Sequence, residues 1–125
     1  MEESQKTQQP QTADEDLTVE YANNVYFSPN IWDLKLIFGE LGAFKPAVEW
    51  HTSITLPWRQ VKLMAYYLAI NLAAYELNNG PIKVPPSMFP PEPPPPEGPE
   101  KDNPLMQAVF EMVREHREKF LAGQK

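Results

Sequence analysis

The sequence predicts an α+β fold: a three-stranded antiparallel meander followed by a long helix, a proline-rich linker and a C-terminal amphipathic helix, with an oligomeric core. Three observations support this prediction. Apolar and polar residues alternate in three runs between residues 19 and 56, as they do in strands with one wet face. Residues 57–80 follow a helical pattern that is apolar on two opposite sides. Eleven of the fifteen prolines fall within residues 81–104, where neither a helix nor a central strand can form.

The N-terminal residues 1–17 are polar and almost free of large apolar groups, and we expect a disordered acidic tail. We place the β-β-β-α core domain at residues 18–84, the extended linker at 85–103 and a docking helix at 104–122. Residues 19–84 contain five acidic and five basic side chains. Such a balance does not provide the cluster of Lys and Arg that nucleic acid requires, so we expect no nucleic-acid partner.

The three predicted strands lie in "VEYANNVYFSP", "IWDLKLIFG" and "VEWHTSITLP". Asn23 and Asn24 interrupt the first run, which indicates a bulge or a tight turn. The third run alternates most clearly: Val48, Trp50, Ile54 and Leu56 share one parity, and His51 falls on the polar parity. This pattern places Trp50 toward the core and His51 toward solvent.

The long helix is expected to begin with Pro57 at its first position and to end at Asn79 and Gly80, where one residue adopts the left-handed conformation. One apolar face contains Val61, Met64, Ala65, Leu68, Leu72 and Tyr75. The opposite face contains Leu63, Tyr66, Tyr67, Ile70, Ala74 and Leu77. Because one small sheet covers only one face, we predict that the second face is a subunit interface. The alternative is that the C-terminal helix of the same chain covers it.

The proline run favours polyproline II, in which residues 85–103 would span roughly 60 Å at about 3.1 Å per residue. The helix after it is expected to have Asn103 as its N-cap and Pro104 at its first position. Its apolar stripe contains Leu105, Val109, Met112, Val113, His116 and Phe120. We predict that the run is a spacer that brings this helix to its own core, to a sister subunit or to another protein. The alternatives are that "PPEPPPP" itself binds an aromatic groove, or that the run is an unstructured tether.

The segments "YANNVYFSPNIWDLKLIFGEL" and "LPWRQVKLMAYYLAINLAAYELNNGPI" resemble a family of short prokaryotic proteins, catalogued as a domain of unknown function, number thirty-four sixty-seven. The similarity covers about residues 19–83. It is carried by residues 21–24, by Ser28, Pro29 and Asp33, by Phe38 and Gly39, and by Tyr75, Glu76, Gly80 and Ile82. The resemblance implies the β-then-α layout and no mechanism. The proline run, the last helix and the strand with Trp50 and His51 depart from the family pattern.

The chain offers no recognisable catalytic, cofactor or metal site. It has no cysteine, which excludes disulfides and thiolate-ligated metals. His51 and His116 lack a second histidine or a paired acid at metal-ligand spacing, and we interpret both as structural. "GELGAFKP" lacks the spacing of a phosphate loop. Nothing indicates a signal peptide or an apolar stretch of about 20 residues, so we expect a soluble cytoplasmic protein without a membrane span.

We therefore predict a non-enzymatic homo-oligomer, a dimer or larger, that acts through its apolar helix faces and its proline-tethered C-terminal helix. Its interface is expected to combine the second face of the long helix with the apolar stripe of the last helix. The same pattern predicts, as a further option, a protein partner docked by the last helix or by the proline run. The alternative function is a chaperone-like or regulatory binder that holds a client segment.

Overall fold

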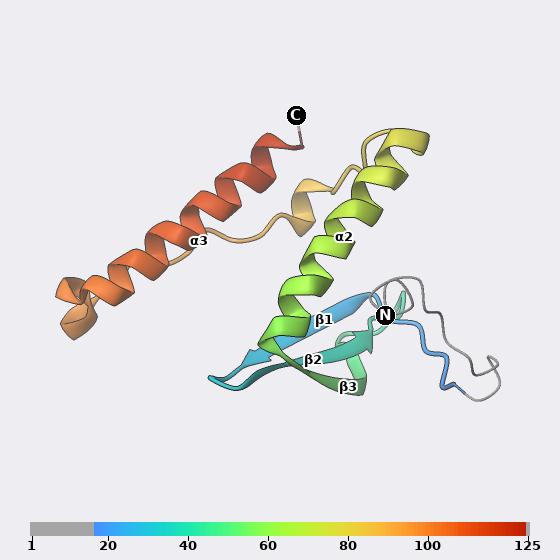
Figure 1. Ribbon diagram of the computed structural model, residues 1–125, viewed down its shortest axis with the longest axis horizontal. Helices are drawn as coiled ribbons and strands as arrows, with labels where there is room; N and C mark the ends of the chain where they lie inside the picture. The colour runs from blue at the N-terminus through green and yellow to red at the C-terminus, as the bar shows by residue number, and fades with distance from the viewer. Residues whose placement is uncertain (1–16, 125) are drawn as a thin grey trace, which may run out of the picture. The chain divides into compact units, whose positions relative to one another are not determined.

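The structure is a computed structural model that describes residues 17–124 (Figure 1). The described chain divides into two compact units between Ile70 and Asn71, and the helix α2 (Trp58–Asn79) runs through this boundary. The order of elements confirms the predicted α+β layout of a meander, a long helix and a C-terminal helix. The predicted tail lies outside the described residues except for Leu17.

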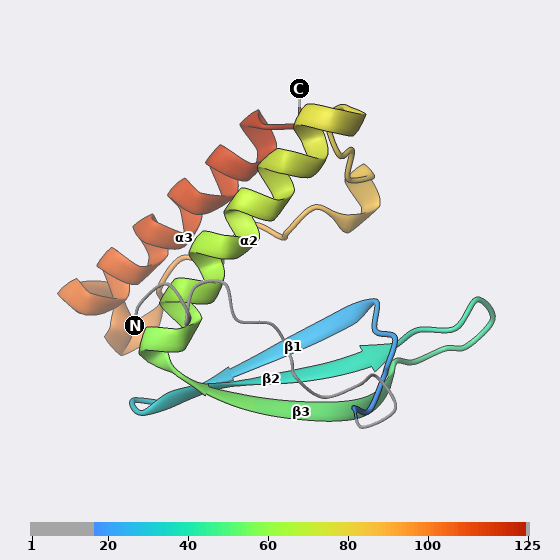
Figure 2. The same ribbon diagram turned by 45° about the vertical axis from the view of Figure 1, so that its right-hand side comes forward.

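The sheet of the first unit is an antiparallel meander of β1 (Asn24–Pro29), β2 (Asp33–Glu40) and β3 (Glu49–Pro57), with β2 in the centre (Figure 2). Leu34 and Leu36 on β2 are the two large apolar side chains that are almost fully buried among the described residues, at 7% and 6% exposure. The hydrophobic core of a single chain is therefore very small.

Two asparagines hold the ends of the first strand. Asn30 Oδ1 accepts hydrogen bonds from the backbone N–H groups of Trp32 (2.7 Å) and Asp33 (2.9 Å), which closes the β1–β2 turn. The indole N–H of Trp58 donates to the carbonyl of Asn30 (2.8 Å), so the first residue of α2 is tied to that turn. The side chain of Asn23 forms two hydrogen bonds with the backbone of Leu41. Its Nδ2 donates to the carbonyl of Leu41 (3.2 Å), and its Oδ1 accepts from the N–H of Leu41 (2.8 Å). The side chain thus replaces a ladder pair just before β1.

A β-bulge in β3 changes the predicted orientation of two residues. Phe38 pairs with Thr52 and Gly39 pairs with Trp50, so His51 is the extra residue on β3. The extra residue shifts the alternation of β3 by one position, so residues before the bulge point to the opposite side from the one that strict alternation predicts. Trp50 therefore shares a face with Gly39, and His51 lies on the side of Phe38. For this reason Trp50 does not lie on the core side of the sheet as predicted, and His51, although exposed as predicted, lies on the side of Phe38.

Gly39 makes room for the ring of Trp50. A Cβ atom at Gly39 would lie 2.7 Å from Cε3 of Trp50, 2.7 Å from Cγ1 of Val48 and 2.8 Å from the carbonyl of Glu49. Trp50 also forms an edge-to-face pair with Tyr26, whose ring centroid lies 6.4 Å away. The Trp50 ring can occupy this place only because position 39 has no side chain.

The end of α2 follows the predicted signals. Gly80 adopts φ 88°, and its N–H donates to the carbonyl of Glu76 (2.9 Å). The carboxylate of Glu76 accepts a hydrogen bond from the N–H of Ile82 (2.9 Å). At the other end, Pro57 is the last residue of β3, so α2 begins at Trp58, one residue later than predicted.

Two short 3₁₀ turns, η2 (Pro86–Met88) and η3 (Gly98–Asp102), interrupt the proline segment before α3 (Pro104–Ala122). Asn103 caps α3 as predicted, since its Oδ1 accepts from the N–H groups of Leu105 (2.9 Å) and Met106 (3.4 Å).

We expect Gly39→Ala to lower the free energy of unfolding by about 2 kcal/mol, because the added methyl group overpacks a site closed by Trp50, Val48 and backbone. Urea unfolding monitored by tryptophan fluorescence measures this change. Gly123→Ala is the matched control, since a Cβ there meets backbone atoms no closer than 3.5 Å. Equal stability of the two variants would contradict the assigned packing of Trp50.

Candidate interaction site

Helix α2 has 22 residues and no buried side chain. Val61 and Met64, near its start, are half-buried, and every other side chain of the helix is exposed. The predicted interface residues Leu63, Tyr66, Tyr67, Ile70, Ala74 and Leu77 are all exposed, and the large apolar ones range from 46% for Ile70 to 87% for Leu77. This face is a continuous apolar surface.

The opposite face of α2 is also uncovered. We expected it to be packed within the chain, but Leu68, Leu72 and Tyr75 are 53%, 54% and 55% exposed. Within the described residues this expectation holds only for the first two turns, where Val61 and Met64 are half-buried. Both sides of the helix therefore present apolar side chains to water.

In the second unit, the proline segment folds back along α3. Phe89 forms an edge-to-face pair with Phe120, with ring centroids 6.1 Å apart. The guanidinium Nε of Arg117 donates to the carbonyl of Pro90 (3.0 Å), and the N–H of Val84 donates to the side-chain oxygen of Gln124 (3.0 Å). Positions 84, 89 and 90 of the segment thus meet positions 124, 120 and 117, so the segment and α3 run antiparallel.

A hollow of about 560 Å³ lies between the segment and the helix. It is lined by residues 90–96 and Glu100, and by Met106, Val109, Phe110 and Val113 of α3. We expected an extended spacer that delivers α3 elsewhere. Within the described residues the segment instead covers its own helix, and α3 packs on the proline segment and η3.

The proline segment covers only part of the apolar side of α3. Of the predicted stripe, Val109 and Val113 line the hollow and Phe120 packs on Phe89, whereas Leu105, Met112 and His116 do neither. All six remain at least partly exposed, Leu105 the most at 65%. Met106 and Phe110, which we did not predict, also line the hollow and are half-buried. Met106 and Phe110 are four residues apart and lie next to the predicted stripe, so the sequence could have indicated a wider apolar face on this helix.

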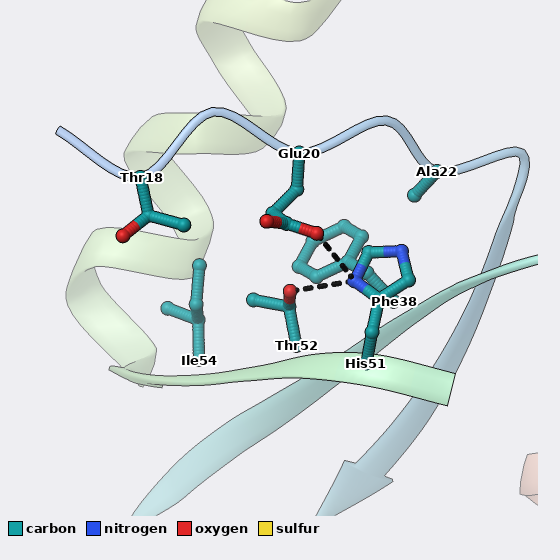
Figure 3. A pocket seen from close by; sticks show the side chains of 7 residues that line it. All are labelled: Thr18, Glu20, Ala22, Phe38, His51, Thr52 and Ile54. Atoms are coloured by element: carbon teal, nitrogen blue, oxygen red, sulfur yellow. Dashed lines mark hydrogen bonds and ion pairs between the residues drawn. The ribbon is translucent and has the colours of Figure 1, made fainter. Parts of the chain in front are cut away.

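The bulge creates a second hollow, of about 550 Å³, over the sheet (Figure 3). It is lined by Thr18, Glu20, Ala22, Phe38, His51, Thr52 and Ile54. Residues 18–22 pass over β3, and the His51 ring lies beneath them (Figure 3). Strict alternation of β3 would have turned His51 to the other side of the sheet, so its place in this pocket was not predicted.

His51 holds the N-terminal segment on the sheet. Its Nε2 lies 2.9 Å from the carbonyl oxygen of Tyr21, so Nε2 carries a proton and donates. Its Nδ1 lies 2.7 Å from the hydroxyl of Thr52 and 3.4 Å from a carboxylate oxygen of Glu20. In the neutral ring Nδ1 accepts from Thr52. Both nitrogens are thus engaged, which supports a structural interpretation of this residue.

None of the helices in residues 17–124 has the length and apolar character needed to cross a bilayer. No three side chains of His, Asp or Glu in that range are grouped as ligands of one metal ion.

No protein-family model matches the chain, and neither a curated protein nor a solved structure is similar to it. The resemblance to the prokaryotic family therefore stays a prediction, and the function has to be argued from the surfaces described above.

We expect Phe89→Ala to loosen the proline segment from α3, because it removes the ring that packs on Phe120. An aromatic pair contributes about 1 kcal/mol beyond its buried area, so amide hydrogen exchange in the last turns of α3 should rise roughly fivefold or more. Met88→Ala is the matched control, since Met88 is 68% exposed. Unchanged exchange in Phe89→Ala would contradict the assigned packing.

Proposed function

We propose that this chain is a non-enzymatic interaction module that associates with copies of itself through α2. One observation carries the proposal: a helix of 22 residues is apolar on both sides and has no buried side chain. Full burial of a Leu or Ile side chain stabilises by about 1.5–3 kcal/mol. Several such residues left in water on one helix favour a state in which another surface covers them.

The size of the core supports self-association. With Leu34 and Leu36 as the two almost fully buried large side chains of the described residues, a single chain has little to offset the entropy of folding. Small scaffolds with insufficient cores gain stability by oligomerisation. Residues 19–84 contain equal numbers of acidic and basic side chains, so two copies of the core do not repel each other through net charge.

The C-terminal helix offers a second contact surface in the proposed assembly. The proline segment orders α3 within its own unit and leaves Leu105 and Met112 exposed, at 65% and 47%. We propose that this remaining stripe, which includes His116, contacts either the assembly or a separate protein partner.

We expect the wild-type chain to sediment as an oligomer and Ile70→Asp to sediment as a folded, smaller species. Ile70 is 46% exposed in the single chain, so the charge should not disrupt the subunit but should be buried without a partner in the interface. Central interface residues contribute 2 kcal/mol or more, which weakens association by roughly 30-fold or more. Analytical ultracentrifugation measures the mass, and circular dichroism checks the fold.

Phe44→Asp is the matched control, because Phe44 is fully exposed and lies outside α2. It should leave the mass unchanged. A monomeric wild-type chain would overturn the proposal and favour a client-binding role for the same apolar faces. An Ile70→Asp protein with unchanged mass would show that this face of α2 is not the interface.

A further inference from the structure

We infer that α2 pairs with α2 of a second copy in antiparallel orientation, about a two-fold axis near Ile70, with Lys62 of each copy beside Glu76 of the other. This inference rests on the proposed self-association and adds its geometry. Three independent features of α2 support it: the spacing of its apolar residues, their sizes and the placement of its charges.

The apolar residues of this face are spaced symmetrically about Ile70. Leu63, Tyr66, Ile70, Ala74 and Leu77 follow one another with steps of 3, 4, 4 and 3, and Tyr67, the sixth residue of the face, has Ala73 as its equivalent across Ile70. A reversed copy centred on Ile70 therefore meets the same pattern at every position. Leu63 then faces Leu77 of the second copy, and Ile70 faces its own equivalent.

The sizes of the side chains favour the antiparallel pairing over the parallel one. In the antiparallel pair each Tyr66 faces Ala74 of the other copy, so a large side chain meets a small one in both layers. In a parallel pair Tyr66 would face Tyr66, and Ala74 would face Ala74. That arrangement combines an overpacked layer with an underpacked one, and both are destabilising.

The charges of α2 fit the same arrangement. Its charged residues are Arg59, Lys62 and Glu76. Lys62 lies near the positive end of the helix dipole and Glu76 near the negative end, which is unfavourable within one helix. An antiparallel neighbour reverses this effect, because Lys62 then lies near the C-terminal end of the other helix and Glu76 near its N-terminal end.

Lys62 and Glu76 also lie on the same edge of the apolar face, about 40° apart at 100° per residue. In a two-fold antiparallel pair, like edges of the two helices meet, so two Lys62–Glu76 pairs form across the interface. The Glu76 carboxylate already accepts from the N–H of Ile82, and a carboxylate accepts several donors at once. A parallel pair would bring Lys62 beside the opposite edge of the other helix at the same height, where Gln60 offers no negative charge.

Cysteine cross-linking distinguishes the two orientations without interference, because the chain contains no cysteine. Leu63 and Leu77 are 50% and 87% exposed in the single chain, so cysteines at these positions should not disturb the subunit. We expect a mixture of Leu63→Cys and Leu77→Cys chains to form a disulfide-linked dimer on mild oxidation. Leu63→Cys alone should not, since its two thiols would lie about 21 Å apart along the helix, from 14 residues at about 1.5 Å each.

A charge exchange tests the same geometry in solution without cross-linking. We expect Lys62→Glu to weaken association roughly tenfold, because both ion pairs become repulsive. The double variant Lys62→Glu with Glu76→Lys should restore wild-type association, since the pairs form again with exchanged signs. Restoration by the second substitution also shows that the single variant is not merely misfolded.

The outcomes separate this inference from the proposed function. A wild-type monomer by sedimentation overturns both. A wild-type oligomer in which Leu63→Cys cross-links to itself overturns the antiparallel geometry and leaves self-association in place. A wild-type oligomer with neither mixed nor self cross-links, and with no effect of Lys62→Glu, shows that another surface covers α2 and also overturns the geometry.

Discussion

The need to remove the two apolar faces of α2 from water dominates the energetics of this chain. A one-layer sheet with two almost fully buried leucines has too little apolar surface to cover a helix of 22 residues on both sides. Tying Trp58 to Asn30 fixes the start of the helix and leaves the rest of its length uncovered. Hydrophobic stabilisation follows the apolar area removed from water. Covering the exposed faces of α2 would therefore add hydrophobic stabilisation that a single chain lacks.

The proline segment shows a different solution for α3. Proline has no N–H, and a polyproline II backbone has no internal hydrogen bonds, so such a segment can lie on a helix without leaving backbone donors unpaired. Its restricted φ angles also mean that little backbone entropy is lost when it is ordered. Phe89 on Phe120 and Pro90 on Arg117 hold the segment in place. Part of α3 is therefore covered by a proline-rich segment that is itself poorly suited to regular helices and sheets.

Much of the fold could be predicted from local signals, because caps and periodicity depend on near neighbours in the sequence. The three strands, the left-handed Gly80 and the Asn103 cap follow from such signals. The bulge at His51 could not be predicted, since it depends on the pairing of Gly39 with Trp50 across two strands. The path of the proline segment was missed for a similar reason: contacts such as Phe89 with Phe120 join positions far apart in the sequence.

The distribution of charge on α2 explains why a helix so poorly covered has a defined partner in our proposal. Glu76, in the last turn, lies at the end of the helix dipole that disfavours it, and Lys62 lies one turn inside the other end. Among the described residues of a single chain, the Glu76 carboxylate is compensated by the N–H of Ile82 alone, and a reversed neighbour would add the charge of Lys62. The Tyr66 and Ala74 positions add the same preference through packing. Charge and shape thus disfavour the solitary helix and the parallel pair, and both favour the antiparallel one.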